Sequence, residues 1–223
     1  MSARRSLSLH LVATAVALAL LAPLGARAAG APAIAQFDAA FANVHDYTMT
    51  VKSHEFNGSQ TQDRVYHYKF MKPHFEKIAI VSGPGSGGGA VWNGGSQVSG
   101  HQGGMLSFIH LTIGLHDSRA TSLLGYTMID GLMQSVVDKY REVPGQLSQQ
   151  GGPVVDGVGT DVVTLKPSNP AADHNINRWV LYLSKTTHFP IRQIGYDGNT
   201  IVIDQWYSNI KTNVGLTKSD FPF

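Results

Sequence analysis

The sequence of 223 residues contains no cysteine, and only 14% of its residues are charged. Without cysteine the chain cannot form disulfides, zinc–thiolate sites or a cysteine nucleophile. Its stability must then come from a hydrophobic core, and the length is sufficient for one domain with a sizeable core. Lysine and arginine are few and do not cluster, which argues against a nucleic-acid-binding surface.

The N-terminus has the pattern of a secretory signal peptide. Arg4 and Arg5 precede an apolar run from Leu7 to Leu24, and Ala-Arg-Ala at 26–28 fits a small-x-small cleavage site. A membrane anchor is the alternative interpretation, but a proline and a glycine interrupt the end of the run. The paired arginines leave the export route open between general secretion and the twin-arginine system.

Cleavage there divides the chain into a signal peptide, residues 1–28, and a single domain, residues 29–223, in the periplasm. The signal peptide carries three arginines, so 17 basic residues become 17 − 3 = 14 against 15 acidic ones. No linker or internal repeat divides the remainder, and no cysteine follows the cleavage site to accept a lipid. We therefore expect a monomer without a stable membrane anchor.

The hydrophobic pattern predicts an α+β domain. A first helix is indicated by apolar residues three and four apart between Ile34 and Val44, after which the period changes to two. The segment Met105–Leu115 is apolar on nearly all sides and is predicted as the first of two mid-chain helices. It is expected either to be buried or to cover an apolar cavity. The second, Met128–Tyr140, has Thr127 as its cap. The remainder predicts about eight to ten antiparallel strands.

A glycine-rich segment contains a match to G-x-G-x-x-G at Gly83, Gly85 and Gly88. A dinucleotide-binding loop needs a following helix and an acidic residue about 20 positions on. Here a short strand, a turn and another strand follow, and no acidic residue occurs between Glu76 and Asp117. The glycines therefore predict a β–β connection and not a nucleotide site.

The sequence lacks the usual catalytic patterns. It contains neither G-x-S-x-G nor H-E-x-x-H, and its histidines do not have a ligand spacing for one helix face. A metal site would require histidines distant in sequence to converge. The acidic pairs Asp156/Asp161 and Asp197/Asp204 are interpreted as turn or exposed residues. We expect no enzyme activity, no metal and no cofactor.

Apolar residues are more numerous than a sheet with one covering helix requires. One interpretation is an ordinary core between a curved sheet and its helices, and this is the simpler one. The other is that the helices form a lid over a space that accepts acyl chains, since methionine and glycine suit a lid that repacks and hinges.

The last third of the chain, WVLYLSKTTHFPIRQIGYDGNTIVIDQWYSNIKTNVGLTKSDF, resembles the close of LolA-like periplasmic proteins, and the glycine-rich hairpin resembles theirs. An uncharacterised branch of that superfamily is a closer match than the lipoprotein carrier. The resemblance implies an incomplete antiparallel β-barrel, a curved sheet, with a helical lid around an apolar cavity for acyl chains. The closure Asn213–Phe221 would pack Leu216 and Phe221 against the barrel.

Within that fold, the alternation of apolar residues indicates which side chains face the cavity. The expected ligand-binding positions are Tyr68, Phe70, Ile80, Met128, Leu132, Leu181 and Ile203. Arg192 matches the family's arginine after the proline. Its role can be structural, on the strand, or it can contact the ligand. Arg64 does not match the arginine with which lipoprotein carriers latch the lid, a departure that argues against true lipoprotein delivery.

These observations lead to two functional hypotheses. The first is a non-catalytic periplasmic carrier for a lipid or for the acyl chains of a lipoprotein. The alternative is an envelope accessory or sensor module that binds another protein through the open edge of the barrel.

Overall fold

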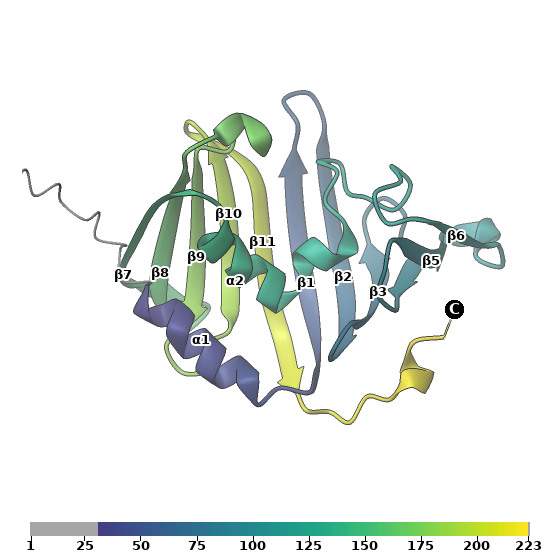
Figure 1. Cartoon of the computed structure of the whole chain (residues 1–223). Helices are drawn as coiled ribbons and strands as arrows, with labels where there is room; N and C mark the ends of the chain where they lie inside the picture. Colours follow the sequence, from purple (N-terminus) through teal and green to yellow (C-terminus); the bar gives the residue numbers. More distant parts are fainter. Residues whose placement is uncertain (1–30, 223) are drawn as a thin grey trace, which may run out of the picture.

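The structure, a computed structural model, describes residues 31–222. They form one curved, unclosed antiparallel sheet of eleven strands with the helices across one face (Figure 1). The strand order is β6-β5-β4-β3-β2-β1-β11-β10-β9-β8-β7. The expected α+β half-barrel with a helical lid is therefore confirmed, while the predicted signal peptide, residues 1–28, lies outside the described residues.

The bounds of the elements are as follows. The strands are β1 (Asp46–Phe56), β2 (Thr61–Met71), β3 (Phe75–Ser82), β4 (Gly89–Trp92), β5 (Gln97–His101), β6 (His110–Gly114), β7 (Gly145–Val155), β8 (Val158–Pro167), β9 (Arg178–Ser184), β10 (Pro190–Asp197) and β11 (Thr200–Thr212). The helices are α1 (Pro32–Ala42) and α2 (Met133–Glu142), and the 3₁₀ turns are η1 (Gly104–Leu106), η2 (Met128–Gly131), η3 (Pro170–Ala172) and η4 (Lys218–Asp220).

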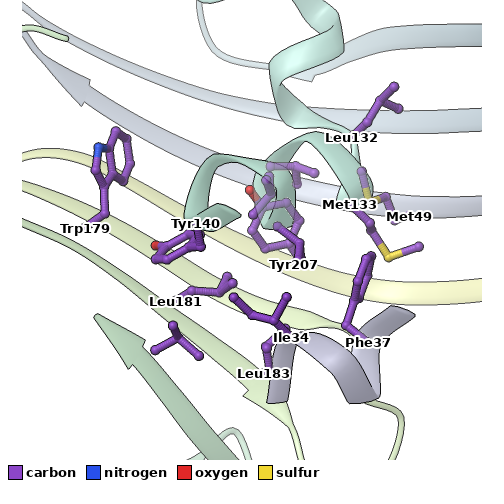
Figure 2. Close-up of a cluster of buried hydrophobic side chains, with 14 of the residues drawn as sticks. Ile34, Phe37, Met49, Leu132, Met133, Tyr140, Trp179, Leu181, Leu183 and Tyr207 are labelled. Carbon is purple, nitrogen blue, oxygen red and sulfur yellow. The ribbon is translucent and has the colours of Figure 1, made fainter. Parts of the chain in front are cut away.

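The two α-helices lie on the inner face of the sheet and cover the half formed by β7–β11. Helix α1 begins with Pro32 at its first turn, a favourable position, and buries Ile34 and Phe37. Helix α2 buries Met133, Val136, Val137 and Tyr140. With side chains of β1, β2, β8, β9 and β11 they form the main hydrophobic core (Figure 2). None of the helices in the described part of the chain has the length and hydrophobicity to cross a bilayer.

The mid-chain helices differ from the prediction. The predicted helix Met128–Tyr140 is two elements, because Leu132 has an extended backbone (ψ 143°) between η2 and α2. Its predicted start is confirmed: the Thr127 N–H donates to Asp130 Oδ2 (2.7 Å) in a capping box. The break lets η2 and α2 follow the curvature of the sheet separately.

The interpretation of Met105–Leu115 as a helix is wrong. It holds the end of η1 and the edge strand β6, which pairs only with β5. No strand of the described residues pairs with its other edge, and Met105 is 93% exposed and Phe108 is 76% exposed. Only the end of the segment is covered, since Ile113 and Leu115 pack in a small cluster with Val98 and Met128.

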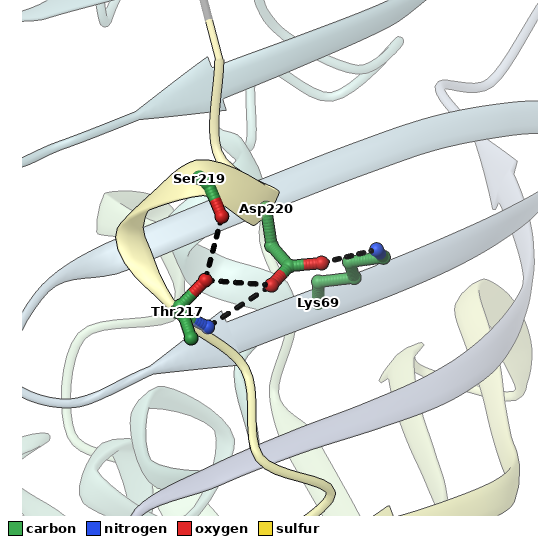
Figure 3. Close-up of polar contacts among 4 residues, drawn as sticks. All are labelled: Lys69, Thr217, Ser219 and Asp220. Carbon is green, nitrogen blue, oxygen red and sulfur yellow. Dashed lines mark hydrogen bonds and ion pairs between the residues drawn. The ribbon is translucent and has the colours of Figure 1, made fainter.

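The C-terminal segment runs back along the sheet towards β3 (Figure 1). Asp220 accepts hydrogen bonds from the Thr217 N–H (3.0 Å) and from Lys69 Nζ (3.2 Å) (Figure 3). Phe221 is buried with its ring 5.9 Å from that of Phe75, as the resemblance implies, and Leu216 is half-buried. This closure fastens the chain end to β2 and β3.

Candidate functional site

The inner face of β1 and β2 changes character along the strands. Buried residues alternate along β1, and the inward side chains change from apolar to polar towards the hairpin: Met49, Val51, Ser53 and Glu55. The paired strand β2 changes in the same way, since its inward aromatic residues give way to Arg64 on the side of the hairpin. The apolar face of the sheet therefore has a polar end near the β1–β2 hairpin.

A pocket of about 540 Å³ lies over this transition. Its floor comes from β1–β4, and its walls come from the β3–β4 loop, residues 101–104 and the segment 119–131. This volume is within the range of small-molecule sites in proteins. Helices α1 and α2 contribute no residue to it, but the pocket adjoins the main core, and Tyr66 and Tyr68 belong to both.

The apolar part of the pocket is formed by aromatic and aliphatic side chains and a methionine. These are Tyr66, Tyr68, Ile78, Ile80 and Met128. The turn η2 approaches the sheet closely here, since a Cβ on Gly131 would lie 2.9 Å from Tyr68 Cζ. Only glycine at this position permits η2 to lie against Tyr68 without displacing its ring.

The polar part of the pocket contains a buried carboxyl group and a guanidinium. Glu55 is 3% exposed and its Oε2 accepts the Leu124 N–H (3.0 Å). Burial raises the pKa of the Glu55 carboxyl, because water no longer solvates its charge. Arg64 donates from Nε to the Pro84 carbonyl oxygen (2.8 Å) and from Nη1 to Tyr66 Oη (3.4 Å).

The glycine-rich loop forms one wall of the pocket. It joins the antiparallel strands β3 and β4, which confirms the predicted β–β connection. A Cβ on Gly83, whose φ is +91°, would overlap the Asp63 carbonyl oxygen, so the loop folds tightly against β2. Gly85 and Gly88 also line the pocket. The glycine pattern does not reveal this second role, because it depends on a loop that meets β2 through the hydrogen bond from Arg64 Nε to the Pro84 carbonyl oxygen.

The seven expected cavity residues fall into two groups. Tyr68, Ile80 and Met128 line the pocket. The other four belong to the packed core and are at most 2% exposed: Phe70, Leu132, Leu181 and Ile203. The alternation of apolar residues identifies the inner face of the sheet, but it does not show which part of that face a helix covers. Pocket residues and core residues therefore have the same pattern in the sequence.

Other candidate groups are accounted for by structural contacts. Arg192 donates from Nε and Nη2 to the two carboxylate oxygens of Asp204 (2.8 and 2.6 Å) across β10 and β11. Asp204 is therefore not an exposed turn residue, and the Arg192 side chain has a structural contact. Within residues 31–222, no group of three or more histidine, aspartate or glutamate side chains could hold a metal ion.

The open antiparallel sheet with its helical cover is the architecture that the resemblance implies. A scan against protein-family models and a search of curated proteins find no match. Solved structures with a similar fold include an uncharacterised conserved protein from Thermus thermophilus, at 10% identity and a TM-score of 0.55 over 85% of this chain and 90% of that one.

A second is MucB, at 12% identity and a TM-score of 0.50; the match covers 87% of this chain but 64% of MucB. A third is a LolA superfamily protein from Nitrosomonas europaea, at 10% identity and a TM-score of 0.39 over 86% of this chain and 96% of that one. At these identities the likeness concerns the fold alone.

Proposed function

We propose that the protein is a non-catalytic periplasmic carrier that binds an acyl chain of a lipid or lipoprotein in the pocket over β1–β4. The observation that carries the proposal is an accessible pocket of about 540 Å³ whose apolar wall continues into a polar end. A ligand with a hydrocarbon chain would replace water on Tyr68, Ile80 and Met128 and gain the free energy of burying apolar surface.

The remaining expected positions have a different place in this proposal. Phe70 and Leu132 lie in the core that adjoins the pocket, so a long acyl chain would reach them only by displacing η2. Leu181 and Ile203 lie in the same core on β9 and β11, and we expect them to support the fold without contacting a ligand.

The test is a charged substitution in the apolar wall. In Ile80→Glu a carboxylate would face the acyl chain, and we expect at least a tenfold loss of affinity for a fluorescent long-chain fatty acid, about 1.4 kcal/mol. The matched control is Ile201→Glu, since Ile201 is a 36% exposed isoleucine outside the pocket. Equal affinity in the two variants would contradict the placement of the ligand.

A second candidate function, docking of an envelope protein at the β6 edge, is favoured by a separate observation. Met105, Phe108, Ile109 and Leu111 are all more than 40% exposed at or beside this strand. No charged residue occurs between Lys77 and Asp117. An uncharged apolar patch beside an unpaired strand edge is typical of a protein-interaction site. MucB, which has a similar fold, has been solved in complex with MucA.

The two candidates respond to different substitutions. A protein partner bound at the edge should be lost in Phe108→Ser and retained in Ile80→Glu, as measured by crosslinking and pull-down from envelope extracts. The fatty-acid affinity should show the opposite pattern. If Phe108→Ser captures the same protein as the unmodified chain, the edge is not the docking site.

A further inference from the structure

Ser53 and Arg64 place two polar side chains together at the end of the pocket's apolar wall. They are directly opposite each other in the antiparallel β1–β2 ladder, one step beyond the Val51–Tyr66 inward pair. Directly opposite residues have Cβ atoms about 5 Å apart on one face of the sheet. The two side chains therefore leave the sheet on the same face, and both residues line the pocket.

Both groups retain hydrogen-bonding capacity. Ser53 is 7% exposed, and its buried Oγ has no hydrogen-bond partner in the described part of the chain. Buried polar groups normally have a partner, so an unpaired hydroxyl facing a pocket indicates a ligand or water position. The Arg64 guanidinium uses Nε and Nη1, while between residues 31 and 222 it forms no ion pair and Nη2 makes no hydrogen bond.

The other charged groups of the pocket are already engaged. Arg119 forms two hydrogen bonds with the carboxylate of Asp117. Asp130 caps η2 through Thr127. Glu55 accepts the Leu124 N–H, and burial raises the pKa of its carboxyl. Among the described residues that line the pocket, Arg64 is thus the arginine whose charge no carboxylate pairs.

We propose that Arg64 and Ser53 bind the anionic head group, a carboxylate or a phosphate, of a long-chain amphiphile whose hydrocarbon chain lies along Tyr68 and Ile80. This inference rests on the proposed carrier function and narrows its ligand class to a fatty acid or a phosphate-headed lipid. A guanidinium offers paired N–H donors that match the oxygens of either group, and such charge-assisted hydrogen bonds are stronger than neutral ones.

The experiment compares three ligands that share a saturated chain: palmitate, hexadecyl phosphate and the neutral methyl palmitate. Each is titrated against the unmodified protein, Arg64→Gln, Ser53→Ala and the matched control Arg178→Gln, an arginine on β9 that lies outside the pocket. We expect Arg64→Gln to weaken palmitate and hexadecyl phosphate by about tenfold or more and methyl palmitate by less than about twofold. Ser53→Ala should weaken the anionic ligands severalfold, and Arg178→Gln should leave all three unchanged.

Arg64→Lys keeps the charge and controls for folding: it should still prefer palmitate to methyl palmitate. The tighter of the two anionic ligands identifies the head group as carboxylate or phosphate. If methyl palmitate binds the unmodified protein as tightly as palmitate, or if Arg64→Gln weakens all three ligands equally, the head-group inference is overturned while the carrier proposal stands. If none of the three binds, the carrier proposal fails and the inference fails with it.

Discussion

Glu76, on β3, is fully buried, and neither of its carboxyl oxygens has a hydrogen-bond partner in the described chain. Burial, assisted by the negative charge of Asp130, raises the pKa of this carboxyl well above its ordinary value of 4.5. The folded state therefore favours the protonated acid, and ionisation favours the unfolded state. The wild-type protein should lose stability as pH rises above about 4.5 through the folded pKa.

We predict that Glu76→Gln, which cannot ionise, removes this loss. The variant and the wild type should be similar in stability at pH 4.5, and the variant should be the more stable at pH 8. Urea unfolding at both pH values measures the difference. Glu142→Gln, at an exposed position of α2, is the control. Its difference in unfolding free energy from the wild type should be the same at pH 4.5 and at pH 8. A pH-independent advantage of Glu76→Gln would contradict the buried acid.

Gly131 is a residue whose missing side chain shapes the pocket. Gly131→Ala would press a methyl group against the Tyr68 ring, and we expect it to cost about 1–3 kcal/mol and to reduce fatty-acid affinity by moving η2 or Tyr68. Gly114→Ala is the control, because nothing lies within 4 Å of the added Cβ. Unfolding and binding titrations of both variants test the contact. Equal stability and equal fatty-acid affinity in the two variants would refute it.

At the scale of elements, α2 and β9 form a core that is distinct from the pocket. Leu181 is fully buried in it (Figure 2), whereas Ile80 is half-buried in the pocket wall. We predict that Leu181→Ala costs about 2–5 kcal/mol in unfolding free energy and leaves fatty-acid affinity unchanged below its melting range. A loss of affinity without a loss of stability would place the ligand under α2 instead.

The elements show how far the sequence leads. Strands with clear alternation, such as β1, β2 and β9, can be recognised in the sequence, because one face is buried and the other is in contact with water. Strand β7 cannot be recognised, since its glycine- and glutamine-rich sequence at the sheet edge has no apolar face. Segment β6 misleads in the opposite way: its apolar residues indicate burial, but the topology leaves Leu111 45% exposed and only Ile113 packed in a cluster.

The candidate site is predictable only in part. The inner-face alternation identifies Tyr68 and Ile80, but Ser53 and Arg64 gain significance only through pairing across β1 and β2. The depth of the pocket depends on the approach of Gly131 to Tyr68, a contact between residues far apart in sequence. A single sequence contains the periodicity of each strand but no direct record of such distances.

At the scale of the whole molecule, the inner face is divided between two tasks. The main core lies under α1 and α2 and contains side chains of β1 and β2 as well as of β8, β9 and β11. The pocket adjoins it over β1–β4, where the segment 119–131 and two loops form the walls. The central claim is that this pocket holds an acyl ligand.

Native mass spectrometry of the protein purified without detergent from its own cells, followed by lipid extraction, tests that claim most directly. We predict a bound mass that extraction identifies as an anionic long-chain amphiphile and that is missing from Ile80→Glu but present in Ile201→Glu. A mass equal to that of the chain alone, unchanged after incubation with palmitate, would contradict the carrier account.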